Sequence, residues 1–303
     1  GAVGLQREYR RYYPTGEVSA HVVGFTDVDD HGQEGLELAY EDRLRGVPGA
    51  KRVLQDRLGR VVEEVESIRP PQPGADVVAS LDRRLQYGAY RALKGAVQRH
   101  RASGGSVVVL DPHTGEVLAM VNQPAYNPND RAARTSDRIR NRAVTDVLEP
   151  GSTVKPLTVL AGLAAGYDAD SVLDTRPGVL RVGRLTVRDA RDYGVIDIAT
   201  VLQKSSNVGA SKIALSLPRE VLWRVMDLVG FGLPTGSGFP GEAAGILTDY
   251  SRWGKVHRAT LSYGYGLSVT ALQLARAYAV LAADGVRRPV SFERLEAPPS
   301  GEQ

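Results

Sequence analysis

The chain has 303 residues, of which 42% are hydrophobic and 24% charged, so it can bury one large domain and a smaller one. Its net charge of +3 comes mostly from scattered arginines, which disfavours nucleic-acid binding. It has no cysteine and no apolar run of about 18 residues, so disulfides, a cysteine nucleophile and a membrane-spanning segment are excluded from this sequence.

The first 75 residues have the pattern of a small, strand-rich unit. Residues 17–25 alternate loosely and predict a strand, and residues 32–46 have the spacing of an amphipathic helix that Gly46 closes. Residues 52–65 predict two strands joined by a turn at 56–59. The acidic residues between the first strand and the helix lack the calcium-loop pattern, so we predict a solvated turn and no metal site.

A proline cluster separates this unit from the rest of the chain. Residues 70–74 read Pro-Pro-Gln-Pro-Gly, a stiff and extended composition that is typical of domain boundaries. We therefore predict a boundary near residue 75, with one unit over 1–75 and a larger domain over 76–303.

The larger domain begins with a strand, a helix and a hairpin. Residues 77–81 predict a short strand, and Asp82 is the expected cap of a helix that runs to about His100. We expect its inner face to carry Leu85, Ala89, Leu93, Ala96 and Val97. Residues 106–111 are apolar almost throughout, which predicts a strand buried on both faces, and a turn at 112–115 leads into a second strand over 116–121.

A serine and a lysine lie three residues apart at the start of the next predicted helix. Pro150 and Gly151 break the preceding structure, Ser152 can begin a helix, and residues 154–163 have apolar positions at near-helical spacing. Lys155 is then on the same face as Ser152, so its amine can reach the serine oxygen. This spacing combines a nucleophile and a candidate base on one rigid element.

A Ser-x-x-Lys sequence alone is weak evidence, because most copies are a helix cap and a solvated lysine. Here a Ser-x-Asn triplet, Ser205 to Asn207, follows about fifty residues later, after a predicted helix over 198–202. The pair of motifs is the signature shared by penicillin-binding proteins and class A β-lactamases.

The remaining segments predict connecting structure. A hairpin is expected over 179–187 about Gly183, a glycine-rich loop over 230–242 and a helix over 271–283. Tyr263 and Tyr265 precede that last helix, and they either line a groove or pack on the core.

Five sequence motifs together resemble the class B penicillin-binding proteins of the cell-division type. They are EPGSTVKP at 149–156, KSSN at 204–207, YGYGLSVT at 263–270, GFPGE at 238–242 and DPHTGEVLAM at 111–120. The segment GQEGLE at 32–37 also resembles the non-catalytic pedestal domain of that family. The resemblance covers nearly the whole chain.

The resemblance implies an α+β fold, in which a strand-rich pedestal precedes a transpeptidase domain built from an antiparallel sheet and helices. It implies a septal transpeptidase that cross-links peptidoglycan through D-Ala-D-Ala stem peptides or a lipid-linked precursor and that β-lactams acylate. The implied catalytic residues are Ser152, Lys155, Ser205 and Asn207, with Glu149, Tyr263 and Tyr265 as candidate substrate contacts. A hydrogen bond from Asn207 is expected to favour the neutral Lys155 amine. No metal or organic cofactor is implied.

The resemblance also implies partners and a location. The partners are membrane proteins of the division complex, and the location is the periplasmic face of the bacterial inner membrane, reached through an N-terminal helix outside this sequence.

One family motif is missing. No Lys-Ser/Thr-Gly triplet occurs between residues 208 and 303, and His113-Thr114-Gly115, which resembles it, precedes Ser152 and reads as a hairpin turn. We expect the chain to stop before that strand, and the sheet to lack its last strands and one oxyanion donor, so acylation is expected to be slow. Two alternatives stay open at this point: a serine β-lactamase, and a β-lactam sensor or division scaffold without turnover.

Overall fold

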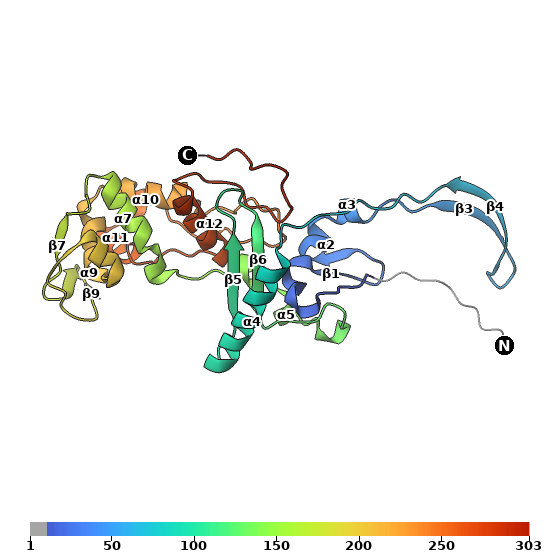
Figure 1. Cartoon of the computed structure of the whole chain (residues 1–303), viewed down its shortest axis with the longest axis horizontal. Helices are drawn as coiled ribbons and strands as arrows, with labels where there is room; N and C mark the ends of the chain where they lie inside the picture. Colours follow the sequence, from blue (N-terminus) through green and yellow to red (C-terminus); the bar gives the residue numbers. More distant parts are fainter. Residues whose placement is uncertain (1–10, 303) are drawn as a thin grey trace.

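The computed structural model describes residues 11–302, apart from the side chains of residues 63 and 64. The molecule is elongated, with a helical lobe at one end, a central hairpin and a first unit at the other end (Figure 1). An arm made of β3 (Ala50–Gln55) and β4 (Val61–Arg69) projects from the first unit. No helix within residues 11–302 is both long enough and apolar enough to cross a membrane.

The first unit begins with helical turns where the sequence predicted a strand. η1 (Gly16–Val18) and α1 (Ala20–Val23) occupy residues 17–23, and only β1 (Phe25–Thr26) is extended. The prediction was wrong because this segment bonds locally: the Val22 and Val23 amides both donate to the Ser19 carbonyl, and α1 buries Ala20 to Val22 against its neighbours.

The helix predicted over 32–46 is divided into shorter elements. β2 (Gly32–Glu34) pairs with β1, and α2 (Gly35–Ala39) is separated from α3 (Glu41–Leu44) by Tyr40, whose backbone leaves helical geometry. The predicted hairpin that follows is confirmed, and the Asp56 carboxylate accepts from the Leu58 and Arg60 amides at its turn. This arm leaves six apolar side chains exposed: Leu54, Leu58, Val61, Val62, Val65 and Ile68.

The helix α4 (Arg83–His100) is capped by Asp82 as predicted, with Oδ1 accepting from the Arg84 and Leu85 amides at 2.8 and 3.0 Å. Its buried face differs from the prediction, because Gln86 and Tyr90 are buried whereas Leu85 is 45% exposed. Gln86 is buried because its amide donates to the Val18 and Met120 carbonyls and so ties the first unit to the central hairpin.

The central hairpin pairs β5 (Gly105–Leu110) with β6 (Val117–Gln123) in antiparallel register. β5 is only half-buried along its length, so the prediction of burial on both faces was wrong; within residues 11–302 it pairs with β6 alone. Residues 77–81 form no regular strand either, since Ala79 makes one isolated bridge to Glu293. The mixture of helices and antiparallel pairs confirms the predicted fold class.

Between the central hairpin and the lobe the chain forms short helical elements: η2 (Arg131–Ala133), α5 (Ser136–Ile139) and α6 (Arg142–Thr145). The lobe contains η3 (Gly151–Val154), α7 (Lys155–Ala164), α8 (Ile198–Gln203), α9 (Asn207–Ser216), α10 (Arg219–Leu228), η4 (Tyr250–Arg252), α11 (Lys255–Leu261) and α12 (Ala271–Ala282). Four short strands form two antiparallel pairs at its edge: β7 (Val172–Asp174) with β10 (Val195–Asp197), and β8 (Val179–Val182) with β9 (Leu185–Arg188).

A large apolar core holds most of this lobe together. Its fully buried members include Val154, Leu157, Ile213, Leu222 and Met226, which come from η3, α7, α9 and α10. Pro156 is tolerated because it lies in the first turn of α7, where the amides have no intrahelical acceptor. The core therefore fixes the helix that carries the Ser-x-x-Lys sequence.

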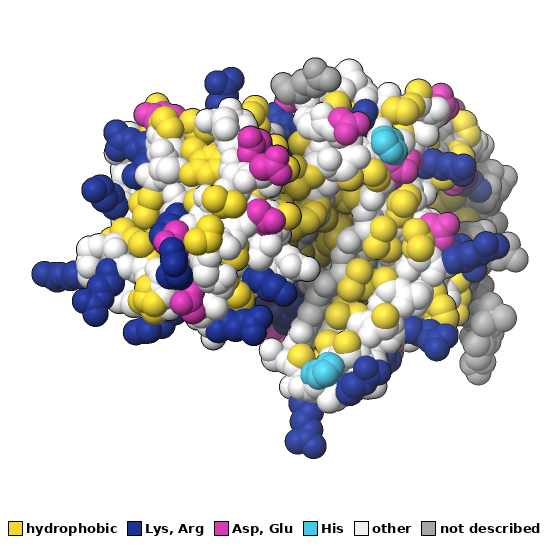
Figure 2. Space-filling model, turned by 60° about the vertical axis from the view of Figure 1, so that its left-hand side comes forward, with side chains coloured by type: hydrophobic (Ala, Val, Ile, Leu, Met, Phe, Trp, Pro, Cys, Tyr) yellow, Lys and Arg dark blue, Asp and Glu magenta, His cyan; other side chains and the backbone are white. Residues whose placement is uncertain are grey.

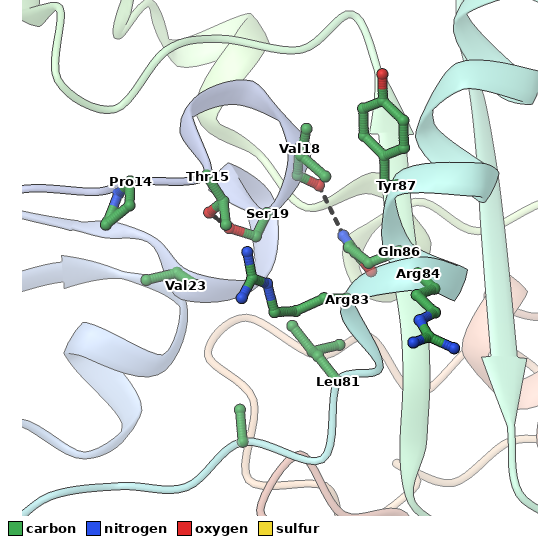
Figure 3. A pocket seen from close by; sticks show the side chains of 11 residues that line it. Pro14, Thr15, Val18, Ser19, Val23, Leu81, Arg83, Arg84, Gln86 and Tyr87 are labelled. Carbon is green, nitrogen blue, oxygen red and sulfur yellow. Dashed lines mark hydrogen bonds between the residues drawn. The ribbon is translucent and has the colours of Figure 1, made fainter.

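The surface shows two further features. Lys and Arg side chains are scattered over the face in Figure 2 and do not gather into one patch. A cavity of about 750 Å³ lies between the first unit and the start of α4, where the Arg83 side chain extends toward Ser19 (Figure 3). None of the candidate catalytic residues lines that cavity.

Candidate active site

Ser152 lies exposed in η3, at the entrance to α7. The segment before it is held in place by a hydrogen bond from the Gly151 amide to the Gly264 carbonyl, at 3.1 Å. A Cβ on Gly264 would lie 2.0 Å from the Gly151 oxygen, so only glycine permits this approach. The serine hydroxyl is thus presented to solvent by a fixed backbone.

The Lys155 amine is surrounded by oxygens. Nζ lies 3.1 Å from Ser152 Oγ, 2.9 Å from Ser205 Oγ, 2.5 Å from the Ser205 carbonyl oxygen and 2.7 Å from Asn207 Oδ1. The structure therefore brings together all four predicted catalytic residues. A neutral amine has two N–H donors, which the Ser205 carbonyl and Asn207 Oδ1 can accept, and its lone pair can then take the Ser152 hydroxyl proton.

Burial lowers the pKa of the Lys155 amine to about 8, against the opposing effect of the Asp189 charge. The amine can therefore lose its proton near neutral pH, as a general base must. The expected contribution of Asn207 was wrong: its Oδ1 accepts from the amine, which favours the charged form, so desolvation alone accounts for the lowered pKa.

Ser205 has an unusual backbone conformation, with φ at +53°. It ends α8 in a turn in which the Ser205 amide donates to the Leu202 carbonyl and the Ser206 amide donates to the Val201 carbonyl. Glycine usually occupies this position of such a turn, because it has no Cβ to clash with the backbone. Here the left-handed conformation directs both the hydroxyl and the carbonyl of Ser205 toward Lys155.

Asn207 is oriented by the end of β9. Its Nδ2 donates to the Arg188 carbonyl at 3.1 Å, which leaves Oδ1 to face the Lys155 amine. The cap of α9 is Ser206 rather than Asn207, since the Ser206 hydroxyl accepts from the Gly209 amide. The asparagine is thus not occupied as a helix cap and is available at the site.

The candidate substrate contacts lie beside this cluster but differ from one another. Glu149 Oε1 accepts from the Gly266 amide at 2.9 Å, so this carboxylate holds the 263–266 loop. Tyr263 is buried against Val187, whereas the Tyr265 side chain is 50% exposed. The Tyr265 ring packs edge-on against the Tyr263 ring, with centroids 5.7 Å apart. Of these three residues, Tyr265 is the one whose side chain is open to solvent and not engaged by the protein backbone.

Sequence reasoning missed Asp189. Its Oδ2 accepts from the Ser206 hydroxyl at 2.6 Å and its Oδ1 accepts from the Val208 amide at 3.0 Å. The predicted hairpin 179–187 ends just before it, but nothing in the local sequence pattern indicates that this carboxylate returns to the Ser-x-Asn turn.

Metal-type ligands come together at one place within residues 11–302. Single ligand atoms of Asp27, Asp29 and His31 lie within 4.8 Å of one another at the end of β1. The Asp27 carboxylate accepts from the Asp29 and His31 amides, so the group is an ordinary acidic turn and is remote in sequence from the serine site.

A Ser-x-x-Lys helix that faces a Ser-x-Asn turn defines the class of folds shared by penicillin-binding proteins and class A β-lactamases. Comparison with known families places the chain more closely. Residues 105–303 match the penicillin binding protein transpeptidase domain, and residues 2–79 match the penicillin-binding protein dimerisation domain. The chain belongs to the penicillin-binding protein transpeptidase family. The resemblance read from the sequence is confirmed, and the predicted boundary near residue 75 stays a prediction.

Named relatives agree with this assignment. The chain is 47% identical to the probable peptidoglycan D,D-transpeptidase PenA of Neisseria meningitidis and 45% identical to the peptidoglycan D,D-transpeptidase FtsI of Escherichia coli. Both matches cover 99% of this chain but only 52% and 51% of the relatives, so the chain spans about half their length.

The fold also resembles solved structures. Penicillin-binding protein 3 of Mycobacterium tuberculosis superposes with a TM-score of 0.84 at 33% identity, over 96% of this chain and 65% of that one. The transpeptidase domain of Burkholderia pseudomallei penicillin-binding protein 3 gives a TM-score of 0.68 at 39% identity, over 76% and 66% of the two chains.

Proposed function

We propose that this chain is the acylating part of a serine-type D-Ala-D-Ala transpeptidase that cross-links peptidoglycan stem peptides at the division septum. One observation carries the proposal: the Lys155 amine lies within hydrogen-bond distance of Ser152, Ser205 and Asn207, and its pKa is lowered to about 8. The names of the FtsI and PenA relatives support the substrate.

The geometry supports a two-step acyl transfer. Lys155 accepts the Ser152 hydroxyl proton, and Ser152 Oγ bonds to the carbonyl carbon of the penultimate D-alanine. The peptide C–N bond then breaks, and the departing D-alanine amine takes a proton that passes through the Ser205 hydroxyl, 2.9 Å from Lys155. In the second step an amine of another stem attacks the ester carbonyl, its N–C bond forms and the C–Oγ ester bond breaks. The proton that the amine loses returns to Ser152 Oγ.

The same site is expected to react with β-lactams, which present a strained amide to the serine. Because the ring-opened product stays tethered, its amine cannot diffuse away, and the acyl-enzyme persists. No step requires a metal or an organic cofactor.

The test is product analysis with a D-Ala-D-Ala stem peptide and an amine acceptor. We expect the wild-type chain to release D-alanine and to form the amide product in equal amounts, and Ser152→Ala to do neither. Release of D-alanine without amide product would contradict transpeptidation. Rapid turnover of a chromogenic cephalosporin would instead favour the β-lactamase alternative, and a stable adduct without any peptide product would favour the sensor or scaffold.

The FtsI relative is named a peptidoglycan D,D-transpeptidase, which supports a location where peptidoglycan is made. We propose that the protein acts at the periplasmic face of the inner membrane and that its first unit contacts membrane proteins of the division complex. The exposed apolar side chains of the β3–β4 arm support such a contact. Replacing Leu54, Val62 and Ile68 by serine should abolish co-purification with the division complex and leave penicillin acylation unchanged. Unchanged co-purification would contradict the role of the arm.

A further inference from the structure

The turn between α8 and α9 carries two of the groups that contact Lys155, and its backbone is strained. Ser205 adopts a left-handed conformation without the freedom of glycine, a cost that persists only where the surroundings enforce it. Ser205 is also exposed to solvent, so core packing around its side chain does not hold it. Some other contact must keep this turn in place.

Asp189 supplies that contact from the end of β9. Its two carboxylate oxygens bind the Ser206 hydroxyl and the Val208 amide, at 2.6 and 3.0 Å. These two groups flank Asn207 in the chain, so one carboxylate fixes the residues on both sides of it. Ser206 is fully buried and also accepts from the Gly209 amide, which extends the link into α9.

The preceding residue reinforces the same arrangement. The Arg188 carbonyl accepts from Asn207 Nδ2, and the Asp189 amide donates to the Gly178 carbonyl at 3.0 Å. Residues 188 and 189 therefore hold both the backbone around Asn207 and its side-chain amide, and they are themselves tied to the β8–β9 hairpin.

We propose that Asp189 is a positioning residue of the active site: its carboxylate clamps the 205–208 turn so that the Ser205 and Asn207 oxygens stay on the Lys155 amine. This inference rests on the proposed acyl-transfer function. Asp189 makes no hydrogen bond to Lys155 among those of the described residues, so it acts through the turn.

The charge of Asp189 has a separate effect that helps to test the proposal. Among the described residues it is the charged group that acts on the Lys155 amine, whose direct contacts, Ser152, Ser205 and Asn207, are neutral. Removing the charge therefore lowers the pKa of Lys155 further, whereas removing the hydrogen bonds loosens the turn. Asp189→Asn removes the charge and keeps an acceptor for the Val208 amide. Asp189→Ala removes both the charge and the hydrogen bonds.

The experiment measures the second-order rate of acylation by a fluorescent penicillin, from pH 6 to pH 9, on the full chain. We expect Asp189→Ala to acylate about 100-fold more slowly, the loss typical of a misplaced catalytic group. Asp189→Asn should recover most of that rate, with the midpoint of its pH profile below that of wild type. The matched control is Asp82→Ala, which also removes a carboxylate with two hydrogen bonds and should melt earlier but acylate at the wild-type rate.

Hydrogen exchange provides a readout that does not depend on activity. The Val208 and Gly209 amides, which Asp189 and Ser206 bind, should exchange faster in Asp189→Ala than in Asp82→Ala or wild type. Wild-type acylation and wild-type exchange in Asp189→Ala would overturn the positioning role. If wild type itself formed no adduct while the exchange difference held, the proposed function would fail and the clamp would stand.

Discussion

Two buried basic side chains make an instructive comparison between the helical lobe and the junction with the first unit. Lys155 and His21 are only 2% and 5% exposed, and burial lowers their pKa values to about 8 and about 4. The Lys155 amine faces an exposed serine hydroxyl. The His21 ring instead donates from Nε2 to the Arg138 carbonyl at 2.8 Å and packs edge-on against Tyr126.

The difference shows what a lowered pKa does and does not indicate. Burial is the main cause of the lowered pKa at both places, and the Arg142 charge adds to it at His21. Only Lys155 has a nucleophile within reach and acceptors that orient its remaining protons. At the junction with the first unit, buried polar side chains hold segments of the chain together. His21, Gln86 and Asn141 each donate a hydrogen bond to a backbone carbonyl of another segment. A lowered pKa of a basic side chain therefore indicates an active site only when a reactive group lies next to that side chain.

The largest expected effect is on the acylation rate, and it separates the two basic residues. Lys155→Met should slow acylation by penicillin by about 10²- to 10⁴-fold, since the serine loses its proton acceptor. His21→Gln should acylate at the wild-type rate, because its ring has no part in the lobe. Stopped-flow fluorescence with a labelled penicillin measures both rates, and equal losses in the two variants would show that Lys155 is not the specific base of the reaction.

The pH dependence of the acylation rate tests whether Lys155 is the general base. Only the neutral amine can accept the serine proton, and with a pKa near 8 its neutral fraction rises roughly fiftyfold between pH 6 and pH 8. The acylation rate should follow that rise and level off above the pKa. A rate that stays flat over this range would mean that a different group limits the reaction.

His21 should instead shape the pH dependence of stability. Its pKa is lower in the folded chain than in the unfolded chain, so the unfolded state binds more protons as pH falls. The stabilisation present above pH 6.5 is therefore lost as pH falls toward 4, by roughly 3 kcal/mol.

Urea unfolding of wild type and His21→Gln at pH 7.5 and pH 4.5 measures this contribution. The difference between the two proteins in the loss of unfolding free energy cancels the contribution of the carboxylates common to both. An equal loss of stability in the two proteins would show that His21 does not carry the effect.

The smallest expected effect concerns two helix ends with the same backbone geometry. Ser205 after α8 and Arg101 after α4 both have positive φ, and each precedes a residue whose amide bonds back five positions, from Ser206 to Val201 and from Ala102 to Val97. Replacing either residue by glycine should relieve strain and stabilise the fold by about 0.5–1 kcal/mol.

The two variants should differ in activity. Ser205→Gly should acylate more slowly because it loses the hydroxyl 2.9 Å from Lys155, whereas Arg101→Gly should keep the wild-type rate. Thermal melts measure the stability of both variants, and acylation rates on the same samples measure their activity. A destabilised Ser205→Gly would show that the serine is not strained.

The sequence predicted what depends on local pattern. The turn-to-helix start at Ser152 and Lys155, the Asp82 cap and the hairpin arm follow from residue spacing and turn composition, and the structure contains them. The helical turns at residues 17–23 were missed because their burial depends on contacts with residues more than a hundred positions away, such as the Tyr126 hydroxyl bond to the Ala20 carbonyl.

The chemical detail of the site was also beyond local reasoning. The left-handed Ser205 contradicts the usual preference of that position for glycine, and the Asp189 clamp joins residues that the β8–β9 hairpin and α8 bring together. Motif spacing identified Lys155 and the three residues around its amine. It identified neither the backbone conformation that directs Ser205 nor the Asp189 contacts that hold that backbone.

The most direct test of the central claim is to map a penicillin adduct on the chain by mass spectrometry after proteolysis. We predict one added penicillin per chain, located on Ser152, formed faster at pH 8 than at pH 6 and absent from Ser152→Ala. An adduct on another residue, or the same adduct in Ser152→Ala, would contradict the assignment of Ser152 and Lys155 as the acylating pair.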